Sequence, residues 1–363
     1  MVDQGLINQA VNAGCRMVVP KVIIDTDAGV DDALAIFMAL AAHKRKEIEV
    51  IAVTTVQGNT EVHNVNTNVL RILNTAALLE IPVYSGATKS LVHQWTHPGE
   101  RFHGSDGFGD AQLPSLPLVT SLLKPQHAVW ALIELVNKYP KEIMLAALGP
   151  LTNLALAIRL DPLFTSHLLG IYMMGGNTTG LGNITSSAEF NFMCDPEAAR
   201  VVLDETLIPI HLTPWEMCLN GVKIPYSQRE KMGQMKSPAA ELMNKIESNI
   251  IKTKEFANWI TCDQLAVAWL IDSAKTQHLN TNCKIDSDVG DKTSDGSRLV
   301  SSTSSCFATV ELNGNLTRGQ MAIDHRELMG RTPNLIIMTS LDEHLYLQYL
   351  RMAFGGNFEK ENE

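Results

Sequence analysis

Four aspartates lie within eight residues near the start of the chain. Residues 25–32 read Asp-Thr-Asp-Ala-Gly-Val-Asp-Asp and directly follow the apolar run Val22-Ile23-Ile24. Crowded carboxylates repel one another unless they are protonated, hydrogen-bonded or bridged by a cation. Carboxylate oxygens are the ligands that hard divalent metal ions prefer. The segment therefore predicts a metal site.

The apolar run predicts a buried strand, and the residues after the acids predict a helix. Side chains alternate along a strand, so Asp25 and Asp27 point the same way, and Gly29 permits a sharp turn. Asp31 and Asp32 open the pattern Asp-Asp-Ala-Leu-Ala-Ile-Phe-Met-Ala-Leu, and acids are favoured in the first turn of a helix. The alternative is that Asp31 only caps this helix while the other acids face water.

Three common motifs do not fit this chain. An EF-hand loop that starts at Asp25 needs an acidic ligand at its twelfth position, where Ile36 stands. A Walker A loop needs a lysine, which residues 148–153 lack. The Asp-x-Asp-x-Thr/Val motif of haloacid-dehalogenase phosphatases is close, but Gly29 occupies its fifth position.

The rest of the chain alternates strand-like apolar runs with helical patterns. We predict strands at residues 48–55, 143–148, 171–174 and 208–212, and helices at residues 61–80, 151–159 and 196–204. This alternation is typical of an α/β fold with a mostly parallel sheet flanked by helices. In such folds the loops at the carboxyl ends of the strands build the site. Glycine and polar residues follow several of the predicted strands, so we expect the site at that edge.

The sequence shows no internal repeat and no linker, which predicts a single domain. We place this domain at residues 21–355, between an N-terminal extension at residues 1–20 and a C-terminal tail at residues 356–363. Residues 284–305 are polar and end in Ser-Ser-Thr-Ser-Ser, which predicts an exposed insertion. Residues 93–113 are rich in glycine and histidine and are expected to form a mobile loop.

Composition excludes several classes of function. The 39 acidic and 29 basic residues give a formal net charge of −10 without a basic cluster, which argues against nucleic acid as a partner. The sequence contains no apolar run of membrane-spanning length and no secretory signal pattern at its N-terminus. The six cysteines are scattered without a CxxC motif, which argues against a zinc cage or a disulfide framework. We therefore expect a cytoplasmic protein with reduced thiols.

Segments along the chain resemble, in the same order, landmarks of the nucleoside hydrolase (inosine–uridine-preferring) family. The first is the Asp-x-Asp-x-Gly-x-Asp-Asp signature of residues 25–32. The others lie at residues 56–59, 103–107, 148–153, 174–176, 188–191, 195–199, 262–263 and 316–319. The resemblance implies a Rossmann-like α/β fold, Ca²⁺-dependent hydrolysis of ribonucleosides in purine or pyrimidine salvage, and a homodimer or homotetramer.

The resemblance also implies a set of metal ligands. One Ca²⁺ would be held by the side chains of Asp27, Asp32 and Asp263 and by the main-chain carbonyl of Leu148. Asp27 would in addition take the proton of the attacking water, which makes it the expected catalytic base. Asp25 is expected to support the site without binding the ion. A helix cap is the alternative for Asp263, because it begins the helical run Asp-Gln-Leu-Ala-Val-Ala-Trp-Leu-Ile.

A second implied set surrounds the substrate. It consists of Asp31, Asn59, Met174, Asn183, Glu189, Asn191 and His103. Other readings of these residues stay open: Asn183 follows a glycine and suits a turn, Met174 suits core packing, and His103 suits a solvated loop. His211, on a predicted strand, is expected to be structural.

Position 262 departs from the family pattern. Many members that prefer inosine and uridine have histidine immediately before the late aspartate, and purine-specific members have tryptophan, whereas this chain has Cys262. A thiol, with an ordinary pKa of about 8.5, is a poor general acid at neutral pH. The group that activates the leaving base therefore stays open between Cys262, His103, Trp215, Trp259 and a chain of water molecules. A small buried residue in the pocket wall is the other reading of Cys262.

Two further functions remain as alternatives. Loss of leaving-group activation would leave a non-catalytic nucleoside or ribose binder that uses the same pocket. A Mg²⁺-dependent phosphatase with Asp25 as its nucleophile is the third hypothesis.

Overall fold

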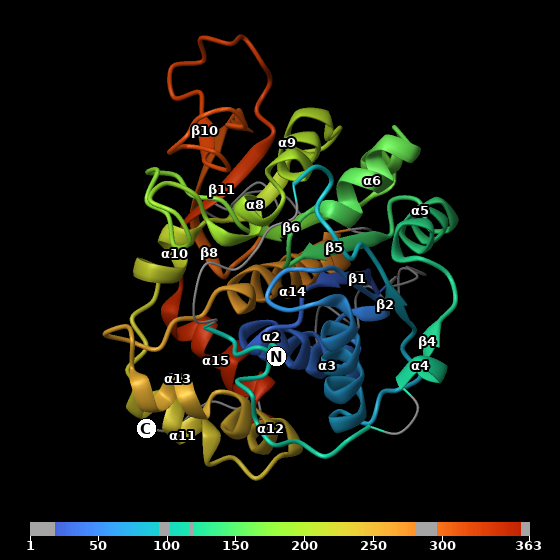
Figure 1. Cartoon of the computed structure of the whole chain (residues 1–363), viewed down its shortest axis with the longest axis vertical. Helices are drawn as coiled ribbons and strands as arrows, with labels where there is room; N and C mark the ends of the chain where they lie inside the picture. Colours follow the sequence, from blue (N-terminus) through green and yellow to red (C-terminus); the bar gives the residue numbers. More distant parts are fainter. Residues whose placement is uncertain (1–18, 94–101, 117–118, 281–295, 357–363) are drawn as a thin grey trace.

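A nine-stranded sheet organises the chain (Figure 1). The computed structural model describes residues 19–93, 102–116, 119–280 and 296–356. The order of the strands in the sheet is β4-β3-β2-β1-β5-β6-β7-β11-β8, and β8 alone runs antiparallel to its neighbour. The strands of this sheet are β1 (Lys21–Thr26), β2 (Glu49–Thr55), β3 (Val83–Ser85), β4 (Leu123–Lys124), β5 (Ile143–Ala147), β6 (Gly170–Met174), β7 (Ile210–Thr213), β8 (Val300–Cys306) and β11 (Leu335–Leu341).

Helices cover both faces of the sheet, and each face has its own apolar core. Along β1, Val22 and Ile24 belong to one core and Ile23 belongs to the other, as the alternation of strand side chains requires. The first core contains residues of α2 (Val30–Lys44), α3 (Val62–Thr75), α10 (Trp215–Asn220), α11 (Tyr226–Gly233), α12 (Pro238–Ile246), α13 (Ser248–Thr253), α14 (Asp263–Asn280) and α15 (Glu343–Ala353). The second contains residues of α5 (Ala128–Lys138), α6 (Thr152–Leu160), α7 (Phe164–His167), α8 (Phe190–Cys194) and α9 (Pro196–Glu205).

The remaining elements are short. They are α4 (Val119–Leu122) and a two-stranded antiparallel sheet of β9 (Ala308–Val310) and β10 (Met321–Ile323). Within the described ranges, no helix combines the length and apolar character that crossing a membrane requires.

The central elements are buried on all sides. Ile23 and Ile24 of β1 are fully buried, and α2 buries 11 of its 15 residues. A helix that is apolar around its whole circumference needs neighbours around its whole circumference. These neighbours are α14, α15, α12 and α3, together with the sheet. The acidic loop that joins β1 to α2 is therefore held between two rigid elements.

The predicted α/β fold is confirmed, and most predicted elements match within two residues. The helix predicted at residues 61–80 ends at Thr75, because the chain turns at Ala76 and Ala77, the latter with a left-handed φ of 54°. Sequence reasoning also placed residues 284–305 in an exposed insertion. The structure places Val300–Cys306 in β8, an edge strand whose side chains are largely exposed. Residues 284–295 lie outside the described residues, as do residues 1–18 of the predicted extension and 357–363 of the predicted tail.

Candidate active site

The acidic loop lies at the carboxyl edge of the sheet, where several loops converge. Asp25 and Thr26 end β1, and Asp31 and Asp32 stand in the first turn of α2. The segments after β2, β5, β6 and β7 leave the sheet at the same edge, because all four strands run parallel to β1 within the sheet. This is where the fold rule for parallel sheets expects a ligand.

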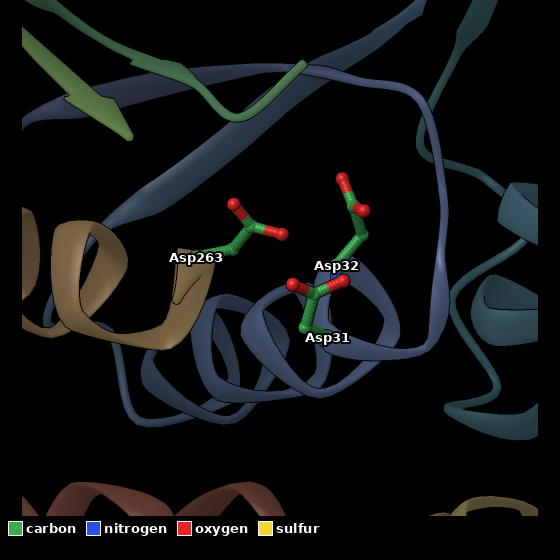
Figure 2. Close-up of side chains that lie close together, drawn as sticks. All are labelled: Asp31, Asp32 and Asp263. Carbon is green, nitrogen blue, oxygen red and sulfur yellow. The ribbon is translucent and has the colours of Figure 1, made fainter. Parts of the chain in front are cut away.

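Three carboxylates from distant parts of the chain form one cluster. An oxygen of each of Asp31, Asp32 and Asp263 lies within 4.8 Å of the others, and Figure 2 shows the three side chains turned toward a common space. Gln264 joins the two helices that carry them, because its Nε2 donates to the main-chain carbonyl of Asp31 over 3.0 Å. The same side chain accepts a hydrogen bond from the N–H of Cys262 at 2.9 Å. Sequence reasoning missed Gln264.

Asp27 is fully buried beside this cluster. Its Oδ2 accepts a hydrogen bond from the main-chain N–H of Asn59 at 2.7 Å, while its Oδ1 has no hydrogen-bond partner among the described residues. Glycines surround this carboxylate: a Cβ atom at Gly58 would lie 2.0 Å from Asp27 Oδ2, and one at Gly149 would lie 3.0 Å from its Cγ. An orphaned carboxylate oxygen in a buried position calls for a ligand.

The carboxylate of Asp32 is held by its own loop. Thr26 Oγ1 donates to its Oδ1, and the N–H of Gly29 donates to its Oδ2 at 2.8 Å. Asn59 reaches the same Oδ2 with its side-chain amide at 3.3 Å. Asn59 therefore contacts both Asp27 and Asp32, and these contacts fix the segment after β2 against the acidic loop.

Burial makes this group of acids costly to ionise. Burial, followed by repulsion from Asp32, raises the pKa of Asp27 well above its usual value, and the same two causes raise that of Asp263. Burial also raises the pKa of Asp31 and of Asp32 to about 6. In the described part of the chain, no lysine or arginine forms an ion pair with any of the four. A hard cation on oxygen ligands is the group that fits these residues.

Leu148 directly follows β5, and both its main-chain N–H and its main-chain carbonyl are hydrogen-bonded. The Leu148 N–H donates to the carbonyl of Asp25 at 2.8 Å, and its own carbonyl accepts from Asn191 Nδ2 at 2.9 Å. Asn191 also donates to the carbonyl of Met174 at 3.1 Å, so one buried amide joins the ends of β5 and β6. Met174 itself is buried, with its sulfur 3.6 Å from the same amide nitrogen.

Glu189 organises the segment after β6. Its carboxylate accepts hydrogen bonds from the N–H groups of Gly176, Asn191 and Phe192, at 2.8, 2.9 and 3.1 Å. Burial raises its pKa to about 7. Asn183 lies on the same segment, but it is exposed, and its side chain makes no hydrogen bond to the carboxylates in the described residues. The structure therefore brings Glu189 and Asn191 into the wall of the site and leaves Asn183 at its surface.

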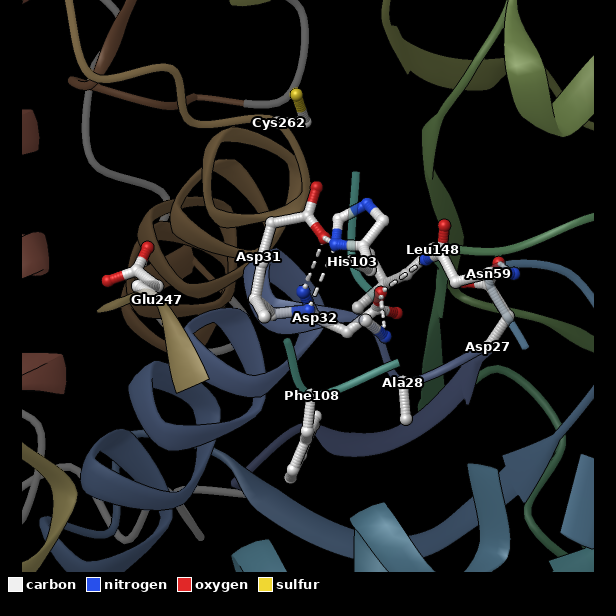
Figure 3. A network of polar contacts seen from close by, with 12 residues as sticks. Asp27, Ala28, Asp31, Asp32, Asn59, His103, Phe108, Leu148, Glu247 and Cys262 are labelled. Carbon is white, nitrogen blue, oxygen red and sulfur yellow. Dashed lines mark hydrogen bonds and ion pairs between the residues drawn. The ribbon is translucent and has the colours of Figure 1, made fainter. Parts of the chain in front are cut away.

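His103 closes one side of the cluster (Figure 3). Its Nδ1 accepts a hydrogen bond from the N–H of Val30 at 3.2 Å and lies 3.7 Å from Asp31 Oδ1. Burial lowers its pKa to about 4, so the ring is neutral and its proton is on Nε2. The loop expected to be mobile contains His103; residues 94–101 of it lie outside the described residues, and Ser105–Asp110 is closely hydrogen-bonded.

The other candidates for leaving-group activation lie deeper. The Cys262 thiol is hydrogen-bonded with Cys218, which, together with burial, raises its pKa well above the ordinary value. Trp215 begins α10, and its ring lies 6.4 Å from that of Phe256. Trp259 is 2% exposed, and its Nε1 donates to Glu247 Oε1 at 3.1 Å. Its indole therefore packs in the buried cluster around Glu247 and not against the aspartate group.

Asp25 is bonded through one carboxylate oxygen, while its Oδ1, like that of Asp27, has no hydrogen-bond partner among the described residues. Its Oδ2 accepts hydrogen bonds from Thr54 Oγ1 at 2.6 Å and Asn153 Nδ2 at 2.8 Å, and burial raises its pKa to about 7. His211 stacks on Tyr172, with ring centroids 4.5 Å apart and an interplanar angle of 9°. Both side chains thus contact neighbouring strands and helices of the sheet, which is a structural role.

Fold and site together define an α/β protein with a carboxylate cluster, able to hold a cation, at the carboxyl edge of a parallel sheet. Residues 22–348 match the model of the family described as inosine-uridine preferring nucleoside hydrolase. The chain belongs to this family, as its sequence motifs indicated. It is therefore an enzyme, a nucleoside hydrolase that acts on ribonucleosides. The carboxylate cluster is consistent with the metal site of the family.

Similar proteins cover most of the chain. It is 31% identical to the inosine-uridine preferring nucleoside hydrolase of Leishmania major, over 84% of this chain and 88% of that protein. It is 39% identical to uridine nucleosidase 1 of Arabidopsis thaliana, over 53% of this chain and 57% of that protein. A solved structure of an inosine-guanosine nucleoside hydrolase superposes with a TM-score of 0.79 at 30% identity, over 94% of this chain and all of the other.

The phosphatase hypothesis is wrong, because the chain belongs to the nucleoside hydrolase family.

Proposed function

We propose that the protein is a Ca²⁺-dependent ribonucleoside hydrolase with Asp27 as its catalytic base. The observation that carries the proposal is the buried Asp27 Oδ1, which has no hydrogen-bond partner among the described residues and lies beside a group of three carboxylates. Uncompensated buried charge is expensive, and a protein retains it where a ligand or a reaction uses it.

The proposed ligands of the ion are Asp27, Asp32, Asp263 and the carbonyl of Leu148. All are oxygen donors, and Ca²⁺ accepts carboxylate and carbonyl oxygens in irregular arrangements. The cluster defined by distance contains Asp31 in place of Asp27. We assign Asp31 to a ribose hydroxyl, since it is the partly exposed member of the cluster and lies 3.7 Å from His103 Nδ1. When bound, the ion supplies the positive charge that orients oxygen atoms of water and sugar.

The chemistry explains the residue types. The water oxygen forms a bond to the anomeric carbon of ribose while the bond from that carbon to the base nitrogen breaks. Asp27 takes the proton of the water, and the base leaves with the electron pair. Positive charge develops on the ribose ring in such a reaction, and the surrounding carboxylates stabilise it. Water and sugar are held in one place, which makes the attack effectively intramolecular.

The ribose contacts are proposed in two groups. Asp31 and Asn59 face the cluster directly and would accept or donate hydrogen bonds to hydroxyls. Glu189, Asn191 and Met174 would act through the wall that they build, since their polar atoms already bond main-chain groups. Asn183, which is exposed, is proposed as a further sugar contact on the family resemblance alone.

We assign the contact with the leaving base to His103. Its Nε2–H is the donor that a base nitrogen or carbonyl needs, and its Nδ1 is already bonded to Val30. Cys262 is assigned to the pocket wall, because its thiol is protonated and paired with Cys218. Trp215 would line the same side, and Trp259 would support it from behind.

The test is a substrate panel on the purified protein. Inosine, uridine, guanosine, cytidine and nicotinamide riboside are incubated with Ca²⁺, and released ribose is measured. We expect turnover of at least one ribonucleoside, slower turnover of its 2′-deoxy form, and loss of turnover with a chelator that Ca²⁺ restores. No ribose from any substrate would refute the proposal.

A nucleoside or ribose binder is the second candidate. It is favoured by one observation: position 262 carries a thiol, which is a poor proton donor to a leaving base. Calorimetry distinguishes the two: tight binding of a nucleoside that is never cleaved selects the binder.

A further inference from the structure

One buried amide joins the two loops on which the proposed function depends. Asn68 lies on α3 and is 2% exposed. Its Nδ2 donates to the carbonyl of Ala28 at 3.2 Å and to the carbonyl of Asp106 at 2.9 Å. Ala28 belongs to the acidic loop, and Asp106 belongs to the loop that begins with His103. Both N–H groups of the amide are thereby used, one on each loop.

The contact on the acidic loop falls at its strained residue. Ala28 has a φ of 37°, a left-handed conformation that residues other than glycine rarely adopt. Such a residue persists only when its surroundings hold it. Thr26 Oγ1 accepts from its N–H at 3.0 Å, and Asn68 donates to its carbonyl. The turn at Ala28 sets the directions of Asp27 on one side and Asp32 on the other.

The loop that begins with His103 packs closely against Asn68 and Ala28. Gly107, with a φ of 82°, packs so tightly that a Cβ atom there would lie 3.0 Å from Asn68 Nδ2 and 3.2 Å from the carbonyl oxygen of Ala28. Thr60 Oγ1 donates to the carbonyl of Ser105 at 2.8 Å and fixes the same loop from another side. His103, at the start of the loop, meets Val30 and Asp31.

We propose that Asn68 is a positioning residue that couples the acidic loop to the His103 loop. It acts through the carbonyl of Ala28 on Asp27 and Asp32, and through the carbonyl of Asp106 on His103. Its effect on catalysis rests on the proposed function. Its effect on cation affinity rests on the proposed Ca²⁺ site, but it is measured without a substrate, and its effect on loop stability rests on neither.

The experiment compares Asn68→Leu with Asn66→Leu. Leucine keeps the branched shape of asparagine and removes its polar atoms, and the same replacement at Asn66 controls for its larger volume. Asn66 is a matched control: it lies two residues away on α3, is 7% exposed, and its amide bonds the side chains of Thr55 and Ser85 instead of the two loops. Both variants lose two buried hydrogen bonds, so we expect similar decreases in melting temperature.

Only Asn68→Leu is expected to change the site. We expect Ca²⁺ affinity by calorimetry and kcat/KM for the best ribonucleoside each to fall on the order of tenfold, the effect of one buried hydrogen bond lost. Amide hydrogen exchange of residues 103–110 should accelerate in Asn68→Leu and not in Asn66→Leu. In a His103→Ala background, the part of the kcat/KM loss that acts through His103 should disappear.

Three results would overturn the proposal. They are unchanged Ca²⁺ affinity and loop exchange in folded Asn68→Leu, equal losses in both variants, and full additivity of Asn68→Leu with His103→Ala. Where Asn68→Leu does not fold, Asn68→Ser, which keeps one donor, gives the same decision from loop exchange. Where the wild-type protein cleaves no ribonucleoside, the proposed function fails, while Ca²⁺ affinity and exchange still decide the role of Asn68.

Discussion

Two buried groups of charges lie in this protein, and they are balanced in different ways. Arg229 and Glu247 form an ion pair, with Nε and Oε2 2.6 Å apart. Trp259 Nε1 donates to Glu247, Asn244 accepts from Arg229 Nη1, and the ring centroid of Phe354 lies 4.6 Å from the guanidinium carbon. The second group consists of Asp27, Asp31, Asp32 and Asp263. Both groups are buried, and both contain carboxylates whose pKa burial raises.

The difference between the groups separates structure from function. The Arg229 cluster contains its own cation, since Arg229 Nε and Nη2 both lie 2.6 Å from Glu247 Oε2. The aspartate group is open, since the described part of the chain pairs no lysine or arginine with these anions and leaves Asp27 Oδ1 without a hydrogen-bond partner. Buried charge that is paired holds the fold in place, and buried charge that is unpaired calls for a ligand from outside. The predictions below test this contrast.

The largest effect is expected at Asp27. Asp27→Ala removes the proposed base and one ligand, and general base catalysis alone contributes about 10²–10⁴ in rate. We therefore expect kcat/KM to fall by at least about 10³, with the circular dichroism spectrum and cooperative unfolding retained. Ribose release from the best substrate measures the loss. An Asp27→Ala variant that keeps most of its activity would remove the base assignment.

Arg229→Met is expected to damage stability and leave the chemistry alone. Removing one partner of a buried ion pair leaves the other charge uncompensated, which costs about 3–5 kcal/mol. We expect the free energy of unfolding in urea to fall by this amount, while kcat/KM of the folded fraction stays unchanged. The double variant Arg229→Met with Glu247→Leu should recover part of the stability. Loss of activity without loss of stability would contradict the assignment of a structural role to the Arg229 cluster.

Sequence reasoning identified one of these two groups and missed the other. The aspartates were visible because four acids in eight residues after an apolar run are rare without a ligand. Asp263 was assigned through the family resemblance, since nothing local distinguishes it from a helix cap. Arg229 and Glu247 are 18 residues apart with no pattern to link them. Their pairing follows from the packing of α11 against α12, which a single sequence does not reveal.

Other residues were missed for a related reason. Asn68 and Gln264 use their side chains on main-chain carbonyls, and any residue supplies a carbonyl, so the sequence of the partner carries no signal. The serine-rich run of β8 was assigned to an insertion because an edge strand with largely exposed side chains shows no apolar alternation. Apolar periodicity locates the inner strands and helices, while polar contacts between distant segments depend on the folded structure.

Removal of the cation should reverse the pH dependence of stability. Burial raises the pKa of Asp31 and Asp32 to about 6 in the folded, metal-free protein. These groups hold protons more tightly when folded, so their contribution is full below the unfolded pKa of about 4 and is lost as the pH rises through about 6. With chelator, we expect the free energy of unfolding to be on the order of 1–3 kcal/mol larger at about pH 5 than at about pH 7.

The loaded protein should behave in the opposite sense. Protons compete with Ca²⁺ for the same carboxylates, so stabilisation by the ion grows as the pH rises. Urea unfolding at the two pH values, with Ca²⁺ and with chelator, measures both slopes. Arg229→Met should lower both curves and change both slopes by the same amount, because Arg229 no longer lowers the pKa of the buried Glu247; the difference between the Ca²⁺ and chelator slopes should stay unchanged. Identical slopes with and without Ca²⁺ would show that the aspartate group binds no ion.

The smallest effect is expected at Cys262. Its thiol is paired with Cys218 and stays protonated, so we assign it to the pocket wall. Cys262→Ser keeps the size and a donor, and we expect kcat/KM to change less than about threefold, within about 0.7 kcal/mol. Cys262→His places an imidazole beside Asp263, and we expect it to shift the preference among bases. A loss of more than about a hundredfold in Cys262→Ser would show that the thiol takes part in the departure of the base. Catalysis would then depend on the wall around Cys262 as well as on the aspartate group.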